Sequence, residues 1–376
     1  MHRRSRIGGH ARSAGEHDLR WRTGARDKAA AQTNRSTHVT TSPADVAVLI
    51  VSYNTEDLLR ESLRSVLDQR GDLRQQIIVV DNGSVDGSVV MVRSEFPEVE
   101  LIDAKQNLGF ARGVNLAATR ANADFLLLLN PDTVVLDRAL ERLVNFARAH
   151  PSHGLYGGRS LRRDGSLELS SCWALPTVWS MTCFALGLST AFRHTRWFDP
   201  EAMADWRRDT VREVGIITGC LLLASRDAWR KLGGFDERYF MYGEDADLAW
   251  RAREAGYRPI ICPEANIIHD VGKASATRAG KLLLLFKGKA TLVRDHFTGW
   301  SKQLVLFELL VGVGLRALLA QIKPRANRSE DDPWTMVWGQ RHDWIVGYPG
   351  VRSGYECGLV TASSVDRRAS GEPGRP

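Results

Sequence analysis

The chain has 376 residues, of which 43% are hydrophobic and 25% charged, a composition typical of a globular protein with one large domain or two ordinary ones. Nearly all of the formal net charge of +7 lies in residues 1–44, which carry nine basic and three acidic side chains. The rest of the chain is close to neutral. Nucleic-acid-binding proteins more often spread basic residues over the folded body, so we expect no nucleic-acid partner.

Residues 1–44 are expected to form a disordered basic tail, with weak attraction to anionic lipid headgroups as the alternative. The tail lacks the continuous apolar segment of a signal peptide. The five cysteines are scattered and include no CxxC pair, which disfavours a zinc cluster or a disulfide framework. Scattered thiols favour a reducing, cytoplasmic compartment.

Strands are predicted to alternate with helices from Val46 onward. Continuous apolar runs predict buried strands at Val46–Val51, Ile77–Val80, Val99–Ile102 and Phe125–Leu129. Helices are predicted over Thr55–Gln69, from Asp86 to about Pro97, over Gly109–Ala121 and over Leu136–Ala149. This alternation indicates βαβ units and an α/β fold with a mostly parallel central sheet flanked by helices.

The second half of the sequence is less regular. It contains an apolar run over Val214–Ala224 and a helix from about Asp247 to Gly256. Two short strands are predicted at Ile260–Cys262 and Asn266–His269, and Lys281–Gln321 is predicted to be mostly helical.

Polar residues follow directly where the predicted parallel strands end. Ser52, Tyr53 and Asn54 follow the first strand, Asp81 follows the second, and Asp132 follows the fourth. Because ligands of open α/β sheets bind at the carboxyl ends of the strands, these residues are predicted to share one rim.

The segment from Val46 to Arg294 resembles the inverting family 2 glycosyltransferases of the GT-A fold, and most of all bacterial rhamnosyltransferases that use dTDP-rhamnose. The resemblance rests on six motifs in order, each of them weak alone: Val51-Ser52-Tyr53-Asn54, Val80-Asp81-Asn82-Gly83-Ser84, Asn107-Leu108-Gly109-Phe110, Asn130-Pro131-Asp132, Gly243-Glu244-Asp245 and His269.

The resemblance implies a nucleoside-diphosphate-sugar donor. It places Asp81 on the imide N–H of uracil or thymine, with Ser52, Tyr53 and Asn54 lining the same pocket and Asn107 bordering it. The alternative for Asp81 is a turn residue in Asp-Asn-Gly-Ser.

The resemblance also implies a divalent cation, Mn²⁺ or Mg²⁺, held by Asp132 and His269. A carboxylate-bound cation neutralises the charge that develops on the leaving diphosphate. The family usually supplies Asp-x-Asp here, but this chain has Asn130 in place of the first acid. An imidazole ligand would favour Mn²⁺. The alternatives are a turn acid for Asp132 and a structural histidine for His269.

Asp245 is implied as the general base that takes the proton of the attacking acceptor hydroxyl. Glu244 is expected to orient the acceptor, and Gly219 to let the sugar approach the backbone. The alternatives are helix capping by Asp245 or Asp247, and a β-bulge at Gly219. The expected acceptor is a glycan or lipid-linked glycan used in cell-wall or surface-polysaccharide synthesis.

A C-terminal amphipathic helix is predicted over residues 297–323. At 100° per residue, Ser301, Glu308, Gly312 and Arg316 form one narrow stripe and leave a broad apolar face. We interpret this helix as associating with the inner face of the cell membrane, with packing on the domain or in a homodimer as the alternative. The predicted domains are thus the tail at 1–44, a GT-A domain at 45–296, this helix, and a loosely ordered tail at 324–376.

Other classes fit the sequence less well. A dehydrogenase is disfavoured because no GxGxxG follows the first strand, and a nucleotidyltransferase because no glycine-rich triphosphate loop opens the chain. A catalytically degenerate partner of another transferase is left open by Asn130, although the intact Glu244-Asp245 pair argues against it.

Overall fold

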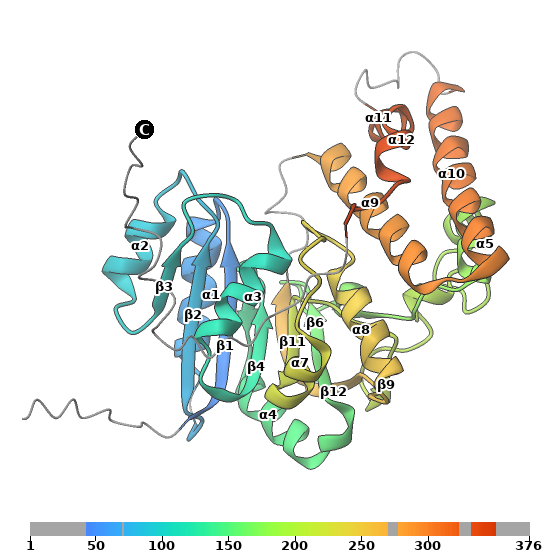
Figure 1. The fold of residues 1–376 in the computed structure, drawn as a ribbon. Helices are drawn as coiled ribbons and strands as arrows, with labels where there is room; N and C mark the ends of the chain where they lie inside the picture. Colours follow the sequence, from blue (N-terminus) through green and yellow to red (C-terminus); the bar gives the residue numbers. More distant parts are fainter. Residues whose placement is uncertain (1–42, 70, 270–276, 323–331, 351–376) are drawn as a thin grey trace, which may run out of the picture. The chain divides into compact units, whose positions relative to one another are not determined.

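One large mixed sheet organises the chain from Ala44 to His269 (Figure 1). The computed structural model describes residues 43–69, 71–269, 277–322 and 332–350, so the predicted basic tail lies almost entirely outside the described residues. Within them the sheet contains ten strands: β1 (Ala44–Ser52), β2 (Gln75–Asp81), β3 (Glu100–Asp103), β4 (Ala123–Leu129), β5 (Thr133–Val135), β6 (Leu155–Leu161), β7 (Leu167–Glu168), β9 (Arg212–Glu213), β11 (Leu221–Ser225) and β12 (Ile260–His269). Two further strands, β8 (Cys172–Trp173) and β10 (Ile216–Ile217), pair with each other.

The strand order is β3-β2-β1-β4-β11-β6-β12-β5, with β7 beside β6 and β9 beside β12. The four strands β3, β2, β1 and β4 run parallel to one another. Strand β11 is antiparallel to both of its neighbours, and β6 and β12 are parallel to each other. The α/β fold is therefore confirmed, and the parallel pairing expected of it is concentrated in the N-terminal half of the sheet.

Helices cover both faces of the sheet and form a separate group after it (Figure 1). Their bounds are α1 (Glu56–Leu67), α2 (Ser88–Glu95), α3 (Phe110–Arg120), α4 (Ala139–Ala149), α5 (Val178–Ala185), α6 (Leu188–Ala191), α7 (Arg226–Leu232), α8 (Glu244–Glu254), α9 (Arg278–His296), α10 (Gly299–Ile322), α11 (Pro333–Gly339) and α12 (Arg341–Trp344).

Strand β1 shows why the parallel part of the sheet is apolar throughout. Val46, Val48 and Ile50 belong to the core that includes side chains of α1, α2 and α4. The residues between them, Ala47 and Leu49 among these, belong to the opposite core, which includes side chains of α3, α7 and α8. Because successive side chains point to opposite faces, a strand covered on both sides must be apolar at every position.

The C-terminal helices build a third core of their own. Phe286 of α9, Leu309 of α10 and Val337 of α11 are all buried in it, as is Trp344 of α12. The expectation that the chain is loosely ordered from residue 324 onward is therefore wrong for residues 332–350. The remainder of that predicted tail lies outside the described residues.

The helical region predicted over Lys281–Gln321 is divided. Helix α9 ends at His296, and α10 begins at Gly299, whose φ is +56°. Among the described helices, α10 is the one whose length and composition would suffice to cross a membrane. Its mean hydropathy is 1.9, and 44% of that stretch is buried against the rest of the protein.

Candidate active site

The ends of β1 and β2 carry the predicted nucleotide residues. Ser52 and Asp81 are direct neighbours in the parallel pairing, as the strand predictions required. The loops that follow are tied together, because the Asn54 N–H donates to Ser84 Oγ (2.9 Å) and Asn54 Oδ1 accepts from the Val85 N–H (2.8 Å). Asn54 therefore has a structural role in joining the two loops, whereas the Tyr53 side chain is exposed.

Asp81 combines deep burial with unused hydrogen-bonding capacity. Its side chain is almost fully buried. Oδ1 accepts from the backbone N–H groups of Gly83 (3.1 Å) and Ser84 (2.8 Å). Oδ2 is buried and has no hydrogen-bond partner within the described residues. An unsatisfied buried carboxylate oxygen is unfavourable, so a ligand N–H donor would be stabilised at this atom.

Asn107 lies in the turn that leads into α3. Its Oδ1 accepts from the Gly109 N–H (3.0 Å), a hydrogen bond that stabilises this turn. The same turn contacts the segment before α8, because the Phe110 N–H donates to Phe240 O (2.7 Å). Asn107 and Tyr53 also line one common cavity, so the structure brings these two predicted residues together.

Asp132 and His269 meet across the pairing of β5 with β12. His269 is paired with Thr133 in this antiparallel register, which brings its Nε2 within 3.5 Å of Asp132 Oδ1. Burial lowers the pKa of His269, but hydrogen bonds to Asp132 and Cys220 outweigh it and raise the pKa to about 10. The raised pKa favours a protonated His269 that forms an ion pair with Asp132, so its Nε2 must lose the proton before it can bind a cation. The 3.5 Å spacing is compatible with two ligands of one ion, because donor atoms at roughly 2.1 Å from an ion lie about 3–4 Å apart.

Glu244 and Asp245 begin α8 immediately after a strained turn. Tyr242 has φ of +67° and Gly243 has φ of +106°. A Cβ on Gly288 of α9 would lie 2.0 Å from Tyr242 O, so a glycine is required for α9 to pack this closely. The left-handed backbone at Tyr242 is unfavourable in conformational free energy, and the packing of α9 holds it in place. Such strained backbone is typical of functional segments.

The two acids have different electrostatic environments. Burial, followed by the charge of Asp245, raises the pKa of Glu244 to about 8. Burial also raises the pKa of Asp245, to about 6, although backbone N–H groups of Ala246 and Gly219 donate to its carboxylate and oppose the rise. The higher pKa of Glu244 means that Glu244 holds a proton in preference to Asp245. This is the protonation state that a base beside a neutral hydrogen-bond donor requires.

Gly219 serves Asp245 directly. Its backbone N–H is one of the donors to the Asp245 carboxylate. A Cβ at this position would lie 2.9 Å from the ring of Phe110. The absence of a side chain is thus explained by packing against Phe110, while acceptor binding at Gly219 stays a prediction.

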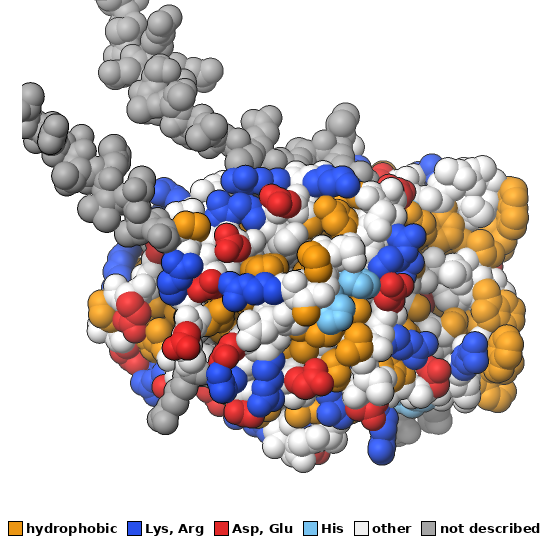
Figure 2. All heavy atoms as spheres, turned by 90° about the horizontal axis from the view of Figure 1, so that it is seen from below, with side chains coloured by type: hydrophobic (Ala, Val, Ile, Leu, Met, Phe, Trp, Pro, Cys, Tyr) orange, Lys and Arg blue, Asp and Glu red, His pale blue; other side chains and the backbone are white. Residues whose placement is uncertain are grey.

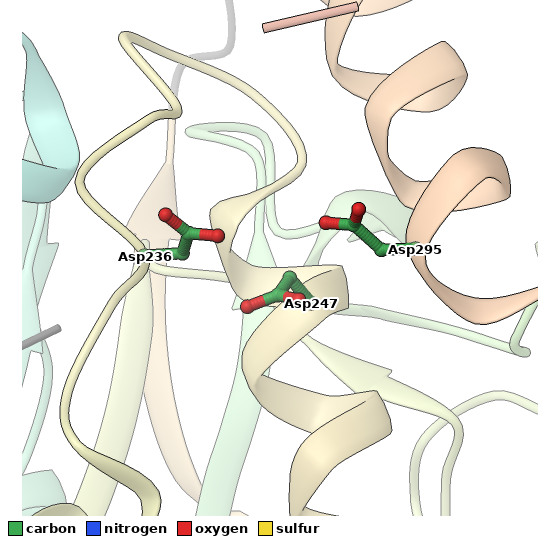
Figure 3. A group of neighbouring side chains, drawn as sticks. All are labelled: Asp236, Asp247 and Asp295. Carbon is green, nitrogen blue, oxygen red and sulfur yellow. The ribbon is translucent and has the colours of Figure 1, made fainter. Parts of the chain in front are cut away.

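Three carboxylates behind this site point toward one another (Figure 3). They belong to Asp236 in the loop before α8, Asp247 on α8 and Asp295 on α9. Arg238 pairs with Asp236 (2.6 Å) and with Asp295. Asp247 pairs with Arg251 (2.7 Å) and with His296 (2.8 Å). The basic partners explain the cluster as a buried ion-pair network that joins α8 to α9, and Asp247 is structural.

Three residues near the site were not among the site residues predicted from the sequence. Ser170 Oγ lies 3.5 Å from His269 Nδ1, and the Cys220 thiol lies beside the same imidazole. Next to Asp81, Asn82 Oδ1 is buried and has no hydrogen-bond partner among the residues that the structure describes. Asn82 could have been found from its place in the Asp-Asn-Gly-Ser turn, whereas Ser170 comes from an irregular segment with no motif.

Two family comparisons cover most of the sheet and α8. Residues 47–207 match the family described as Glycosyl transferase family 2, and residues 210–273 match the N-terminal domain of galactosyltransferase. Together with the α/β fold and the six motifs, these matches define a glycosyltransferase. Over residues 47–207 the chain is similar to the family 2 glycosyltransferases.

The chain is also similar to individual curated proteins and to solved structures. The chain is 27% identical over 311 residues to an N-acetylglucosaminyl-diphospho-decaprenol L-rhamnosyltransferase of Mycobacterium tuberculosis, covering 78% of this chain and 98% of that protein. It is 27% identical over 236 residues to an O-antigen biosynthesis protein of Myxococcus xanthus, covering 60% of this chain and 17% of that protein. A solved mannosyltransferase of Pyrobaculum calidifontis with GDP-mannose and Mn²⁺ is 19% identical, with a TM-score of 0.47 over 82% of this chain and 86% of that one.

Proposed function

We propose that this glycosyltransferase transfers L-rhamnose from dTDP-rhamnose, with inversion, to a hydroxyl of a polyprenyl-diphosphate-linked glycan in cell-wall or surface-polysaccharide synthesis. The observation that carries the proposal is the likeness to the decaprenol-linked L-rhamnosyltransferase, which extends over 98% of that relative. A likeness over a whole chain includes the segments that contact donor and acceptor, as well as the scaffold.

The donor proposal is supported at Asp81. Thymine and uracil both present an imide N–H, and Asp81 Oδ2 is a buried acceptor without a partner in the described chain. Cytosine has no hydrogen at the equivalent ring nitrogen and would face the carboxylate with a lone pair. Asp81 therefore favours a thymidine or uridine donor over a cytidine donor.

The metal proposal rests on Asp132 and His269. A buried carboxylate and an imidazole 3.5 Å apart suit Mn²⁺, and the carboxylate alone suits Mg²⁺. When bound, the cation would neutralise charge on the leaving nucleoside diphosphate. The substitution at Asn130 leaves Asp132 as the sole acid of this motif.

The proton is moved by the protein. Asp245 would accept the proton of the acceptor hydroxyl while the hydroxyl oxygen bonds to the anomeric carbon and the bond to the nucleoside diphosphate breaks. Attack from the face opposite the leaving group inverts the anomeric centre. Glu244 has a buried Oε2 without a partner in the described residues, and its raised pKa keeps it protonated, so it would donate a hydrogen bond to acceptor or sugar.

The location we propose is the cytoplasmic face of the cell membrane. The polar stripe of α10 faces the protein: Glu308 Oε1 accepts from Thr182 Oγ1 (2.5 Å), and Arg316 donates to Phe184 O (2.9 Å). Its outer side exposes Phe307, Leu318 and other large apolar side chains.

Figure 2 shows hydrophobic side chains gathered along the right edge of the molecule, where α5 and α10 lie. Trp197 and Trp300 are also exposed, and Arg193 and Arg196 accompany Trp197. Exposed aromatic and basic side chains beside an apolar stripe suit a lipid headgroup region. A second copy of the chain is the competing occupant of this surface.

The test is a donor panel of dTDP-rhamnose, UDP-galactose, UDP-glucose and GDP-mannose, with and without Mn²⁺. We expect metal-dependent binding and slow hydrolysis of dTDP-rhamnose, and loss of the hydrolysis in Asp245→Asn with the binding retained. Turnover of another donor would refute the sugar assignment. Failure of the folded protein to turn over any sugar nucleotide, even with acceptor present, would refute the function.

A further inference from the structure

A cavity of about 520 Å³ is lined in part by two of the predicted nucleotide residues and extends beyond them to α9 and α12. Tyr53 and Asn107 contribute to its wall, as do Tyr242 from the strained turn and Trp344 from α12. Among the described residues, neither Asp81 nor the Asp132–His269 pair lines it. The cavity therefore shares Tyr53 and Asn107 with the predicted nucleotide site, but it does not include the carboxylates that would hold base and metal.

Two cations from one helix face this cavity. Lys281 and Lys287 of α9 both line it, and both are half-buried. In the part of the chain that the structure describes, neither pairs with a carboxylate. Lys281 Nζ lies 5.7 Å from the centroid of the Tyr242 ring, and Lys287 Nζ lies 4.9 Å from that of Tyr348.

A third lysine of α9 differs from these two because it has a carboxylate partner. Lys289 pairs with Glu201 at 3.5 Å. A cation–π contact positions an ammonium group without neutralising it, so Lys281 and Lys287 keep their charge for a ligand. Asp343 is the one acid among the described lining residues, so the two lysines leave that part of the lining with an excess positive charge. Such a site suits an anion with more than one negative charge.

The rest of the lining is largely apolar. Met241, Leu283, Leu284 and Trp344 supply hydrocarbon and indole surface next to the lysines. A sugar nucleotide offers no extended apolar group to cover such a wall. A diphosphate joined to a hydrocarbon chain offers both parts: phosphate oxygens for the ammonium groups and an apolar stem for the leucines.

We propose that this cavity binds the diphosphate of the lipid-linked acceptor. Lys281 and Lys287 contact the phosphate oxygens, and the first apolar part of the lipid lies against Leu283 and Leu284. The inference rests on the proposed function. It also fits the chain order, because Tyr242 lines the cavity and stands directly before the Gly243-Glu244-Asp245 motif. An acceptor sugar at Asp245 thus has its own diphosphate on the cavity side.

The experiment compares wild type with the double variant Lys281→Gln, Lys287→Gln, using farnesyl diphosphate, farnesol and dTDP as separate probes in equilibrium binding. The matched control is Lys231→Gln, since Lys231 Nζ also lies over a tyrosine ring, 5.0 Å from the centroid of Tyr257, and does not line the cavity. We expect the double variant to bind farnesyl diphosphate about tenfold more weakly or worse, because charge-assisted contacts are lost. Its binding of farnesol and dTDP should match wild type, and Lys231→Gln should bind all three like wild type.

Every other binding result for these three probes also has a defined interpretation. Unchanged farnesyl diphosphate binding in the double variant would overturn the proposal. Weaker dTDP binding would assign the lysines to the diphosphate of the donor and also overturn it. Equal weakening for farnesol would show that the variant has disturbed the apolar wall, and the single variants Lys281→Gln and Lys287→Gln would then have to reproduce the selective loss. Absence of donor turnover in the wild-type protein would count against the proposed function alone, because these probes need no turnover.

Discussion

Replacing Asp81 with asparagine should exchange one nucleobase preference for another. The backbone N–H groups of Gly83 and Ser84 need an acceptor, so the amide oxygen of the introduced side chain takes the place of Oδ1. The amide NH₂ group then occupies the position of Oδ2, which is buried and without a partner in the described chain. The imide N–H of thymine would then face the NH₂ group of the asparagine, which cannot accept a hydrogen bond from it.

The size of the effect follows from that single atom. A hydrogen bond to a charged group contributes about 1.5–3 kcal/mol, which corresponds to a loss of about 10- to 150-fold in dTDP affinity. The ring nitrogen of cytosine can accept from the new NH₂ group, so binding of dCDP should improve in the variant. The matched control is Asp103→Asn, because Asp103 ends the neighbouring strand opposite Asp81 but is paired with Lys105 at 2.7 Å.

Isothermal titration of wild type and both variants with dTDP and dCDP measures these effects. We expect Asp103→Asn to bind both nucleotides like wild type. Equal dTDP affinity in wild type and Asp81→Asn, with both proteins folded, would refute the assignment of Asp81 to the nucleobase. Equal loss of both nucleotides would show that the loop had been disturbed and that no specific base contact had been exchanged.

Three further predictions concern the base, the ion-pair network and the outer surface of α10. Since burial raises the pKa of Asp245 to about 6, the rate should fall as pH drops below that value, and Asp245→Asn should lower kcat by about 10²- to 10⁴-fold at unchanged donor affinity; a pH-independent rate between pH 5 and 7 would contradict this. Asp247→Asn removes the buried negative charge that pairs with Arg251 and contacts His296, and it should lower the free energy of unfolding by about 3–5 kcal/mol in urea denaturation, whereas Asp57→Asn, at an exposed ion pair, should leave it unchanged. Phe307→Asp with Leu318→Asp should abolish sedimentation with anionic liposomes while the protein stays folded; retained lipid binding, or a dimer that the substitutions dissociate, would contradict the membrane surface.

The parallel half of the sheet was predictable because its physical signal is local. Strands covered on both faces need unbroken apolar runs, and the first two runs end at Ser52 and Asp81, which the structure places side by side. Strand β6 was missed because it contains Gly157 and Gly158 and carries an arginine. A Cβ on Gly158 would lie 2.3 Å from Ala265 O, so the feature that hides this strand in the sequence is required by its neighbours.

In the second half of the chain, structure could not be predicted where it depends on contacts between segments that are distant in the sequence. The meeting of Asp132 with His269 depends on β5 pairing with the C-terminal end of β12, which was predicted as two short strands and is one strand with a register shift between Ile261 and Asn266. The polar stripe on α10 was found from its period, but a period does not tell which side faces the protein. Helices α11 and α12 are too short to be stable alone, and they owe their order to the core around Trp344.

The most direct test of the central claim is a transfer assay with dTDP-rhamnose and a short-chain N-acetylglucosaminyl-diphospho-lipid acceptor, read by mass spectrometry of the lipid product. The account predicts addition of one deoxyhexose to the acceptor, dependent on a divalent cation and lost in Asp245→Asn. An acceptor mass that stays unchanged, in the presence of metal and of a folded wild-type protein, would contradict it.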